Sequence, residues 1–150
     1  IEVHLVPQVI GPTKLEDDRL VLKKLYSKFS KNQLVFYHSD NLSPRDLKSL
    51  YGTMHFMIGT RLHSIIFAMG MGVPSIAIAY HGTKAQGIME SIGMSDYILS
   101  IETISFEFLK SKFEDLMLKR NQLESRISNQ LTILNESLNK AIIEILKNYK

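Results

Sequence analysis

The chain contains no cysteine. This absence excludes disulfide bonds, thiolate metal sites and thiol catalysis, and it is typical of a reducing compartment. There is also no apolar run of the roughly 18 residues that a membrane-spanning helix needs. A net charge of only +3 is too small to favour a nucleic-acid partner. We therefore expect a cytoplasmic protein, free or peripheral at the inner membrane face, with neither a membrane span nor a nucleic-acid partner.

Several common site motifs are missing as well. There is no Gly-x-Gly-x-x-Gly and no Gly-x-x-x-x-Gly-Lys-Ser/Thr, which excludes the usual dinucleotide and P-loop sites. There is no Gly-x-Ser-x-Gly nucleophile motif, and no pair of acids is placed for glycosidase chemistry. The histidines have neither metal-ligand spacing nor neighbouring carboxylates. We therefore expect no bound metal and no cofactor.

The composition is that of a folded domain. The chain has 150 residues, of which 45% are apolar and 22% charged, so it is long enough and apolar enough to form a core. It begins at Ile1 rather than at methionine, and residues 2–6 already have the pattern of a strand. We interpret the chain as the second half of a larger protein; a processed or tagged small protein is the alternative.

Short apolar runs alternate with amphipathic segments along most of the chain. The apolar runs predict strands at residues 2–6, 33–37, 54–58, 75–80 and 97–99. The segments between and after them predict helices that begin near Asp17, Ser43, Thr60, Thr83 and Ser105. This alternation is typical of an α/β domain with a mainly parallel sheet of about five strands.

The last segment, residues 121–150, has a different pattern. Its apolar residues recur at spacings of four and three, which predicts one long amphipathic helix; they are Leu123, Ile127, Leu131, Leu134, Leu138, Ile142 and Ile145. We assign residues 1–120 to the α/β domain and residues 121–150 to this helix, which we expect to pack on the same domain or on a missing one. A dimerising coiled coil is the alternative, and the lack of complementary flanking charge disfavours it.

Positive charge is concentrated in one acid-free stretch. No Asp or Glu occurs from Leu47 to Met89, whereas Lys48, Arg61 and Lys84 do. In open parallel sheets ligands bind at the carboxyl ends of the strands, where helix N-termini present backbone N–H groups. The loops that follow predicted strands there are residues 7–12, 59–64 and 80–84. We expect these loops to meet at one edge and to bind an anion, either a phosphate or a carboxylate.

The segment from Gly59 to Ser64 supplies the main candidates. Gly59 lets a ligand approach the backbone closely, and Thr60 is the expected N-cap of the following helix. Arg61 offers a planar fork for a carboxylate or a phosphate. His63 is able to donate a hydrogen bond or to transfer a proton near neutral pH.

Other loops supply further candidates. Lys84 provides a point charge for a phosphate, and Tyr80 provides a hydroxyl or a stacking surface. His81 and Gln8 are polar groups expected to line the site. His55 falls within an apolar run, so we expect a hydrogen-bonded core histidine there rather than a site residue.

The chain resembles the polysaccharide pyruvyl transferase family. The resemblance lies in Gly-x-Arg-x-His at residues 59–63, Gly-x-Pro at residues 72–74 with the strand after it, and Tyr-x-x-x-Lys at residues 80–84. The sequence Val6-Pro7-Gln8 is also similar to the opening strand and loop of the family's second domain. The resemblance covers most of residues 1–100, and the long terminal helix is not diagnostic.

The resemblance implies a two-domain GT-B-like fold, of which this chain is the second, three-layer Rossmann-like half. It implies transfer of a pyruvyl group from phosphoenolpyruvate to a sugar of a cell-surface polysaccharide, which gives a pyruvate ketal. Arg61, His63 and the backbone of Leu62 would contact phosphoenolpyruvate, with His63 as the general acid. The implied partners are this donor, a sugar or lipid-linked oligosaccharide acceptor, and an amino-terminal Rossmann-like domain.

Two other functional classes stay open. GT-B glycosyltransferases and sugar-nucleotide epimerases also bind a UDP-sugar at helix N-termini, and Glu90 is placed late enough in the domain to hold a ribose. Binding of UDP alone would favour this class. A non-enzymatic interaction module would act through residues 121–150, and a dimer that is lost on truncation of that helix would favour it.

Overall fold

The fold is described from a computed structural model of the chain. The structure describes residues 1–29, 31–80 and 84–149. The chain divides into two compact units, which are described separately: unit 1 is Ile1–Arg45 and unit 2 is Asp46–Lys150.

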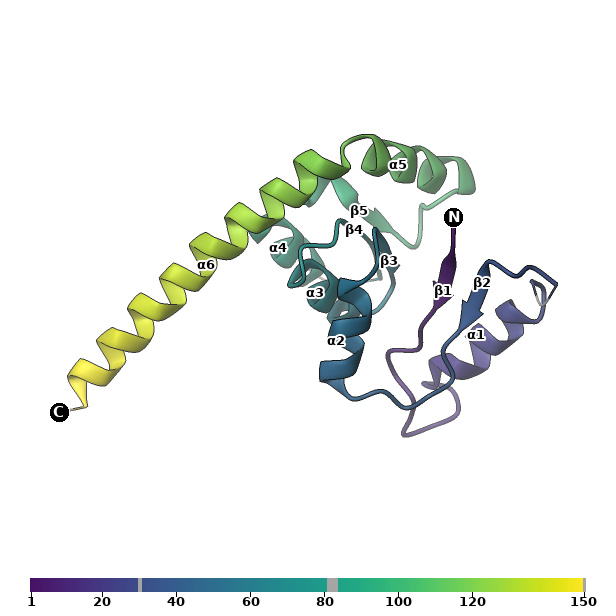
Figure 1. Cartoon of the computed structure of the whole chain (residues 1–150), viewed down its shortest axis with the longest axis horizontal. Coiled ribbons are helices and arrows are strands. Elements are labelled where there is room, and N and C mark those ends of the chain that lie inside the picture. Colours follow the sequence, from purple (N-terminus) through teal and green to yellow (C-terminus); the bar gives the residue numbers. More distant parts are fainter. Residues whose placement is uncertain (30, 81–83, 150) are drawn as a thin grey trace. The chain divides into compact units, whose positions relative to one another are not determined.

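Unit 1 is a βαβ unit. Its two strands run parallel and a helix connects them; in chain order the elements are β1 (Val3–Leu5), α1 (Asp18–Tyr26) and β2 (Val35–Tyr37) (Figure 1). The ring centroids of Tyr26 and Tyr37 lie 5.8 Å apart. The last turn of α1 therefore packs on the end of β2.

Unit 2 contains a three-stranded parallel sheet with helices around it. Its elements in chain order are α2 (Pro44–Gly52, which starts just before the unit boundary), β3 (Met57–Gly59), α3 (Leu62–Met69), β4 (Ser75–Ala79), α4 (Lys84–Ser91), a short 3₁₀ helix η1 (Ser95–Tyr97), β5 (Ile98–Ser100), α5 (Phe106–Leu118) and α6 (Arg120–Asn148) (Figure 1). The strand order is β3-β4-β5, so β4 is central. Ser75, Ile76 and Ala77 are buried, as expected of a central parallel strand.

The strand–helix alternation that the sequence predicts is confirmed. A strand is present in each predicted region, and every strand pair formed by the described residues is parallel. The strands form sheets of two and three members rather than one continuous sheet. The chain is therefore an α/β protein with Rossmann-like parallel sheets and a long C-terminal helix.

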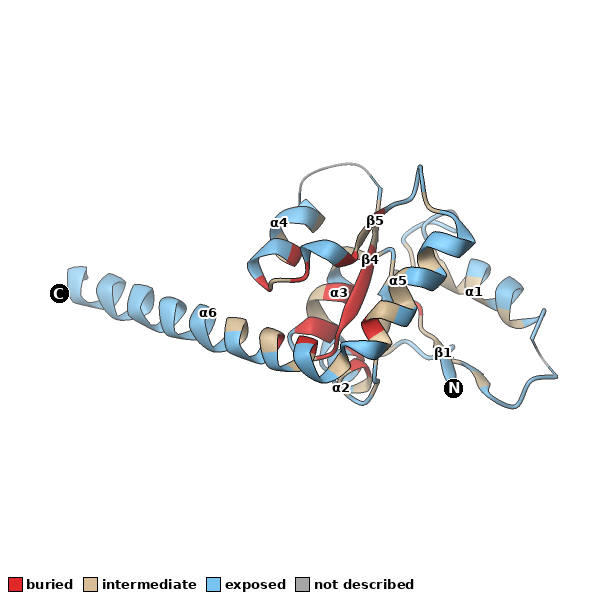
Figure 2. Cartoon of the chain, turned by 90° about the horizontal axis from the view of Figure 1, so that it is seen from above, coloured by how far each residue is buried: buried red, intermediate tan, exposed pale blue. Residues whose placement is uncertain are grey.

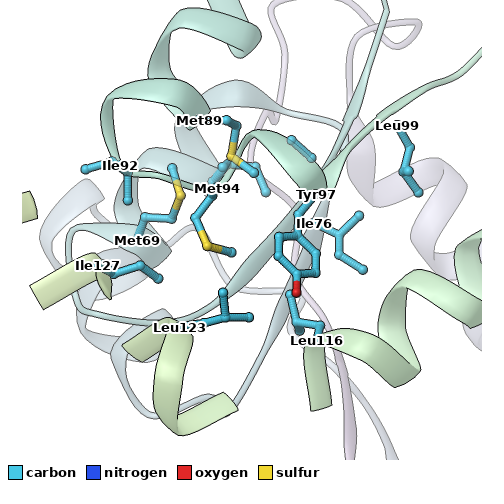
Figure 3. Close-up of a cluster of buried hydrophobic side chains, with 12 residues drawn as sticks. Met69, Ile76, Met89, Ile92, Met94, Tyr97, Leu99, Leu116, Leu123 and Ile127 are labelled. Carbon is cyan, nitrogen blue, oxygen red and sulfur yellow. The ribbon is translucent and has the colours of Figure 1, made fainter. Parts of the chain in front are cut away.

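The core of unit 2 is rich in methionine. In the close-up of Figure 3, Leu123 and Ile127 of α6 lie on one side of Met69, Met89 and Met94. Each of these five side chains is at most 1% exposed. Methionine is unbranched and flexible, which lets it fill the irregular space between α3, α4 and the start of α6.

The end of α4 is fixed by a glycine, as the sequence predicts. Gly93 has a φ of +74°, which favours a residue without a Cβ. The Gly93 N–H donates to the Glu90 carbonyl at 2.9 Å, and the Met94 N–H donates to the Met89 carbonyl at 2.7 Å. This is a Schellman motif, and the buried pair Met89 and Met94 forms its hydrophobic contact. Arg126 of α6 donates to the Gly93 carbonyl at 2.9 Å, which fastens α6 over the same turn.

The long helix α6 is buried only over its first turns. Leu123 and Ile127 lie in the core, and Leu131 packs partly buried against it. Farther along the same stripe, Leu134 is 42% exposed and Leu138 is 58% exposed. In Figure 2 the α6 ribbon accordingly changes from red and tan to pale blue toward the C-terminus. One apolar stripe thus has a buried half and an exposed half.

Replacing Gly87 with alanine is expected to stabilise the protein. Gly87 lies inside α4, and a Cβ added there would meet nothing within 4 Å. Alanine costs less backbone entropy in a helix, so the gain should be about 0.5–1 kcal/mol in the free energy of unfolding. Gly93→Ala is the control, because its Cβ would lie 2.9 Å from the Arg126 Cδ at positive φ, and it should destabilise. Urea unfolding of both variants measures the two signs; a loss of stability in Gly87→Ala would contradict the expectation.

A histidine pair makes the stability of unit 1 depend on pH. The His4 Nδ1 lies 2.9 Å from the His38 Nε2, and His4 stacks on Phe36. Burial is the main cause that lowers the pKa of His38 below its ordinary value of 6.5; the charge of His4 adds to the shift and Asp40 opposes it. Below about pH 6.5 the unfolded chain binds more protons at His38 than the folded chain does, so stability present above that pH is lost as pH falls through the lowered pKa.

The expected result is weaker hydrogen-exchange protection of the β1 and β2 amides as the pH is lowered from neutral, after correction for the intrinsic exchange rate. His38→Gln should remove most of this dependence, because its side chain does not titrate. His55→Gln, which changes a histidine of unit 2, is the matched control and should leave the dependence of these amides unchanged. A dependence that persists undiminished in His38→Gln would show that another group is responsible.

Candidate active site at the carboxyl edge of the unit 2 sheet

The junction of β3 and α3 carries the main candidate residues. β3 ends at Gly59, Arg61 is the N-cap residue with extended backbone (φ −92°, ψ 120°), and α3 begins at Leu62. The Ser64 hydroxyl and the Ser64 N–H both donate to the Arg61 carbonyl, at 2.6 Å and 3.0 Å. These bonds fix the first turn of the helix from inside, which places Arg61 and His63 on an ordered turn.

The prediction that Thr60 caps α3 is wrong. The helix starts one residue later than the cap requires, and its N-cap residue, Arg61, makes no side-chain capping hydrogen bond. Thr60 is an exposed residue of the connecting bend. The physical reason is the backbone of Arg61, which is extended (φ −92°, ψ 120°), so that the Arg61 carbonyl accepts from the Ile65 N–H and the helix begins only at Leu62.

Close packing requires a glycine at position 59, and the sequence alone does not reveal this requirement. A Cβ at this position would lie 2.7 Å from the Ser64 Oγ and 3.0 Å from the Ile65 Cδ1. Both neighbours are buried, and Ser64 is held by its hydrogen bond. Glycine is therefore needed for the strand to pass close over the start of α3. The prediction that Gly59 also admits a ligand stays a prediction.

Exposure differs sharply along the first turn of α3. Arg61 and Leu62 are half-buried and His63 is exposed, whereas Ser64 and Ile65 are buried. His63 is thus accessible to a ligand, while the residues after it anchor the turn in the core. The first N–H groups of a helix have no partner within the helix, so this turn presents positive charge from both backbone and side chains.

The sheet register brings a second group of candidates to the same edge. β3 and β4 are neighbours and run parallel, with Gly59 opposite Ala77. Tyr80 directly follows β4 and is 50% exposed, and Lys84 is the exposed first residue of α4. Adjacent strands lie about 4.8 Å apart, so the segments that leave their carboxyl ends start close together. The sequence predicts that Arg61, His63, Tyr80 and Lys84 lie at one edge of the sheet. This grouping requires that β3 and β4 be parallel neighbours, as they are.

Two further predicted site residues, His81 and Gln8, stay predictions. His81 lies outside the described residues. Gln8 belongs to unit 1, where it is half-buried in the loop after β1. Its backbone N–H donates to the Asp18 Oδ2 at 3.1 Å.

His55 is not the core histidine that its apolar surroundings predict. It is exposed, in a bend before β3, which begins only at Met57 because pairing with β4 starts there. Phe56 is the residue that packs against the core instead, with its ring 5.6 Å from that of Phe113. His55 is therefore a surface residue close to the site in sequence, which makes it a useful control.

Some residues that fix the candidate loops were not predicted from the sequence. Ser64 is the clearest example, and its signal was a small hydroxyl residue three positions after Arg61, a spacing typical of a turn-closing hydroxyl. In unit 1, Asp18 plays a comparable part in the loop of the candidate residue Gln8, because it accepts hydrogen bonds from the Gln8 and Val9 N–H groups. An acidic residue at the first position of a helix that follows a proline-bounded loop was the available signal.

The described residues give no sign of other kinds of site. Among them, no three His, Cys, Asp or Glu side chains are close enough together to hold a metal ion. None of the helices within the described ranges is long and apolar enough to cross a bilayer. A shallow hollow lies between α1 and β2 and contains none of the predicted site residues; it is lined by Ser27, Lys28, Phe29, Lys31, Asn32, Gln33 and Leu34.

Comparison with known proteins identifies the family. The sequence model of the polysaccharide pyruvyl transferase family matches residues 3–82, more than half of the chain. The matched region runs from β1 to just past β4 and includes Gly59–Ser64 and Tyr80, whereas Lys84 lies beyond it. The chain belongs to the polysaccharide pyruvyl transferase family.

One curated relative has a name that fits this family. The amylovoran biosynthesis protein AmsJ of Erwinia amylovora is 25% identical to the chain over 131 residues. The similarity covers 87% of this chain but only 31% of AmsJ, so the chain spans less than a third of its relative. No solved structure matches the chain.

Proposed function

We propose that the chain is the donor-binding part of an enzyme that transfers a pyruvyl group from phosphoenolpyruvate to a sugar of a cell-surface polysaccharide. The observation that carries this proposal is the group of basic residues at the ends of β3 and β4, in a sequence without acids from Leu47 to Met89, in a member of the pyruvyl transferase family. The family name and the name of AmsJ, an amylovoran biosynthesis protein, support a polysaccharide acceptor.

The proposed donor carries negative charges that are complementary to the positive charge of this edge. Phosphoenolpyruvate carries a carboxylate and a phosphate on the same carbon of one small molecule. Arg61 can hold the carboxylate with two parallel hydrogen bonds, and Lys84 can hold the phosphate as a point charge. The N–H groups at the start of α3, including that of Leu62, favour the same negative charge. Tyr80 and His81 complete the proposed binding loop after β4.

His63 is the proposed general acid. It gives a proton to the methylene carbon of phosphoenolpyruvate, and the adjacent carbon becomes an electrophile. One sugar hydroxyl attacks that carbon and loses its proton, which restores the protonated imidazole. Phosphate then leaves, and a second hydroxyl of the same sugar closes the ketal and loses its proton with the phosphate. Arg61 and Lys84 stabilise the leaving charge throughout. The proposal needs no metal and no cofactor, because phosphoenolpyruvate itself supplies the activated group.

The exposed half of α6 fits a larger enzyme. We propose that the stripe from Leu134 to Ile145 packs on an amino-terminal Rossmann-like domain that completes the cleft, and that the enzyme works in the cytoplasm. Several half-exposed leucine and isoleucine side chains on one helix face form an apolar patch larger than single exposed residues would give. The similarity covers only 31% of AmsJ, so a protein as long as AmsJ has room for such a domain outside the matched region.

The test is product formation by a protein that contains this chain together with the amino-terminal domain. Oligosaccharides from partial hydrolysis of the producing cell's polysaccharide serve as acceptors with phosphoenolpyruvate as donor. The expected result is one ketal-linked pyruvyl group on the oligosaccharide, seen by mass spectrometry, for each phosphate released. Phosphate release without any gain in acceptor mass would contradict pyruvyl transfer.

A further inference from the structure

The outer face of α1 carries exposed apolar side chains. The inner face is fixed by Tyr26, whose ring lies 5.8 Å from that of Tyr37, and by the Tyr37 hydroxyl, which donates to the Arg19 carbonyl at 3.3 Å. On the side of the helix away from these contacts, Leu20 is 52% exposed and Val21 is 70% exposed. No residue of α1, all of which the structure describes, is buried, and Figure 2 accordingly shows this helix in tan and pale blue. A surface helix normally turns its apolar residues inward, so this face differs from the usual pattern.

Positive charge without acids surrounds this face. The sequence from Arg19 to Ser39 contains five basic residues and no Asp or Glu. Arg19 is neutralised by its ion pair with Asp17, at an Nη2–Oδ2 distance of 2.7 Å. The remaining four basic residues are all exposed and have no acid within this stretch; they are Lys23, Lys24, Lys28 and Lys31. Their charge therefore faces the solvent next to the exposed apolar side chains.

The turn after α1 continues the same combination of side chains. Lys28 lies one helical turn after Lys24, and with Phe29 and Lys31 it lines the shallow hollow between α1 and β2. Phe29 is 46% exposed, and its carbonyl accepts from the Asn32 N–H at 2.8 Å, so this turn has an ordered backbone. We call this surface of unit 1 the basic face; it consists of Leu20, Val21, Lys24, Lys28, Phe29 and Lys31.

The exposed half of α6 differs from the basic face in charge. The stripe from Leu134 to Ile145 is also apolar, but Glu136 and Glu144 accompany Lys140 and Lys147 there, so two acids cancel two bases. A neutral apolar stripe suits packing on another protein surface. Apolar side chains framed by lysines alone suit the surface of an anionic bilayer, because the lysines reach the headgroups while the apolar groups enter the acyl boundary.

We propose that the basic face docks the protein on an anionic lipid bilayer. Its lysines bind the headgroup phosphates, and Leu20, Val21 and Phe29 enter the boundary between headgroups and acyl chains. A soluble polyanion would account for the lysines but would leave the aliphatic side chains in water, so a lipid surface is the occupant that suits both. α1 has only nine residues, so the contact is shallow and reversible. The proposal does not depend on the proposed function, and its tests need no transfer activity.

The first experiment measures co-sedimentation of the chain with vesicles. Vesicles of phosphatidylcholine alone are compared with vesicles of phosphatidylcholine and phosphatidylglycerol in equal amounts, and binding is expected only to the mixed vesicles. A lysine close to an anionic surface strengthens binding by about fivefold, so the double variant Lys24→Gln/Lys28→Gln should bind about 25-fold more weakly.

The matched control is Lys140→Gln/Lys147→Gln, which removes the same charge from α6. It should bind within about twofold of the wild type, because charges away from the contact are screened by salt. Equal losses in the two double variants, or equal binding to neutral and anionic vesicles, would overturn the proposal. Binding to soluble dextran sulfate without binding to vesicles would overturn it as well.

The second experiment tests whether the apolar side chains enter the bilayer. The chain contains no tryptophan, so Val21→Trp introduces a single fluorescent reporter at an exposed position. Its emission is expected to shift to shorter wavelength with the mixed vesicles and to be quenched by lipids brominated in their acyl chains. Leu138→Trp, on the exposed half of α6, is the matched control and should show neither change. Emission of Val21→Trp that is unshifted and unquenched, or an equal response of the two variants, would overturn docking by the basic face.

Discussion

Replacing His63 with alanine is expected to lower pyruvyl transfer by about 10²–10⁴-fold, the usual contribution of a general acid. His63 is exposed at the first turn of α3, so the loss should come from chemistry and not from unfolding. Exposed substitutions of this kind change stability by about 0.5 kcal/mol or less. The rate of phosphate release from phosphoenolpyruvate in the presence of acceptor, with urea unfolding alongside, measures both quantities.

His55→Ala is the matched control for this experiment. His55 is also exposed and lies only eight positions earlier, but it precedes β3 and is therefore at the opposite end of that strand from His63. Its replacement should leave the transfer rate within about twofold of the wild type. Equal losses in the two variants, or wild-type turnover in His63→Ala, would remove His63 from the mechanism.

Replacing Leu123 with alanine is expected to destabilise the protein by about 2–5 kcal/mol. Leu123 is 1% exposed and packs among the methionine side chains that join α6 to the core (Figure 3). The substitution removes three methyl(ene) groups there and leaves a cavity that the helix is not free to close, since Arg126 is bonded to the Gly93 carbonyl one turn away. The urea midpoint of the cooperative transition measures the loss.

Leu138→Ala is the control on the same helix and in the same apolar stripe. Leu138 is 58% exposed, so its truncation in this chain should change the free energy of unfolding by about 0.5 kcal/mol or less. The contrast tests the division of α6 into a buried and an exposed half. A cost at Leu138 comparable to that at Leu123 would mean that the exposed half is covered in solution.

The fold was predictable because its signals are local. Apolar runs located the strands, and the capping residues Asp17 and Ser105 located two helix starts, where each side chain accepts a hydrogen bond from the first turn. Gly93 marked the end of α4 in the same way, through its positive φ. Each of these signals depends on residues within one turn of the boundary, which is why the sequence alone reveals it.

The site was predictable only in part, because some of the contacts that support it depend on which side chains are buried in the folded protein. The acid-free charge pattern and the strand ends identified Arg61, His63 and Lys84, and parallel pairing accounts for their common edge. The start of α3 was misplaced because Arg61, with an extended backbone and no side-chain capping bond, takes the N-cap position, which no capping residue in the sequence marks.

The most direct test of the account is the amide-shift response of the ¹⁵N-labelled chain to phosphoenolpyruvate and, separately, to UDP. The account predicts saturable shifts with phosphoenolpyruvate at residues 59–64 and at Lys84, loss of these shifts in Arg61→Gln, and no comparable response to UDP. A response to UDP alone, or phosphoenolpyruvate shifts that leave residues 59–64 unchanged, would contradict the placement of the donor at the carboxyl edge of the unit 2 sheet.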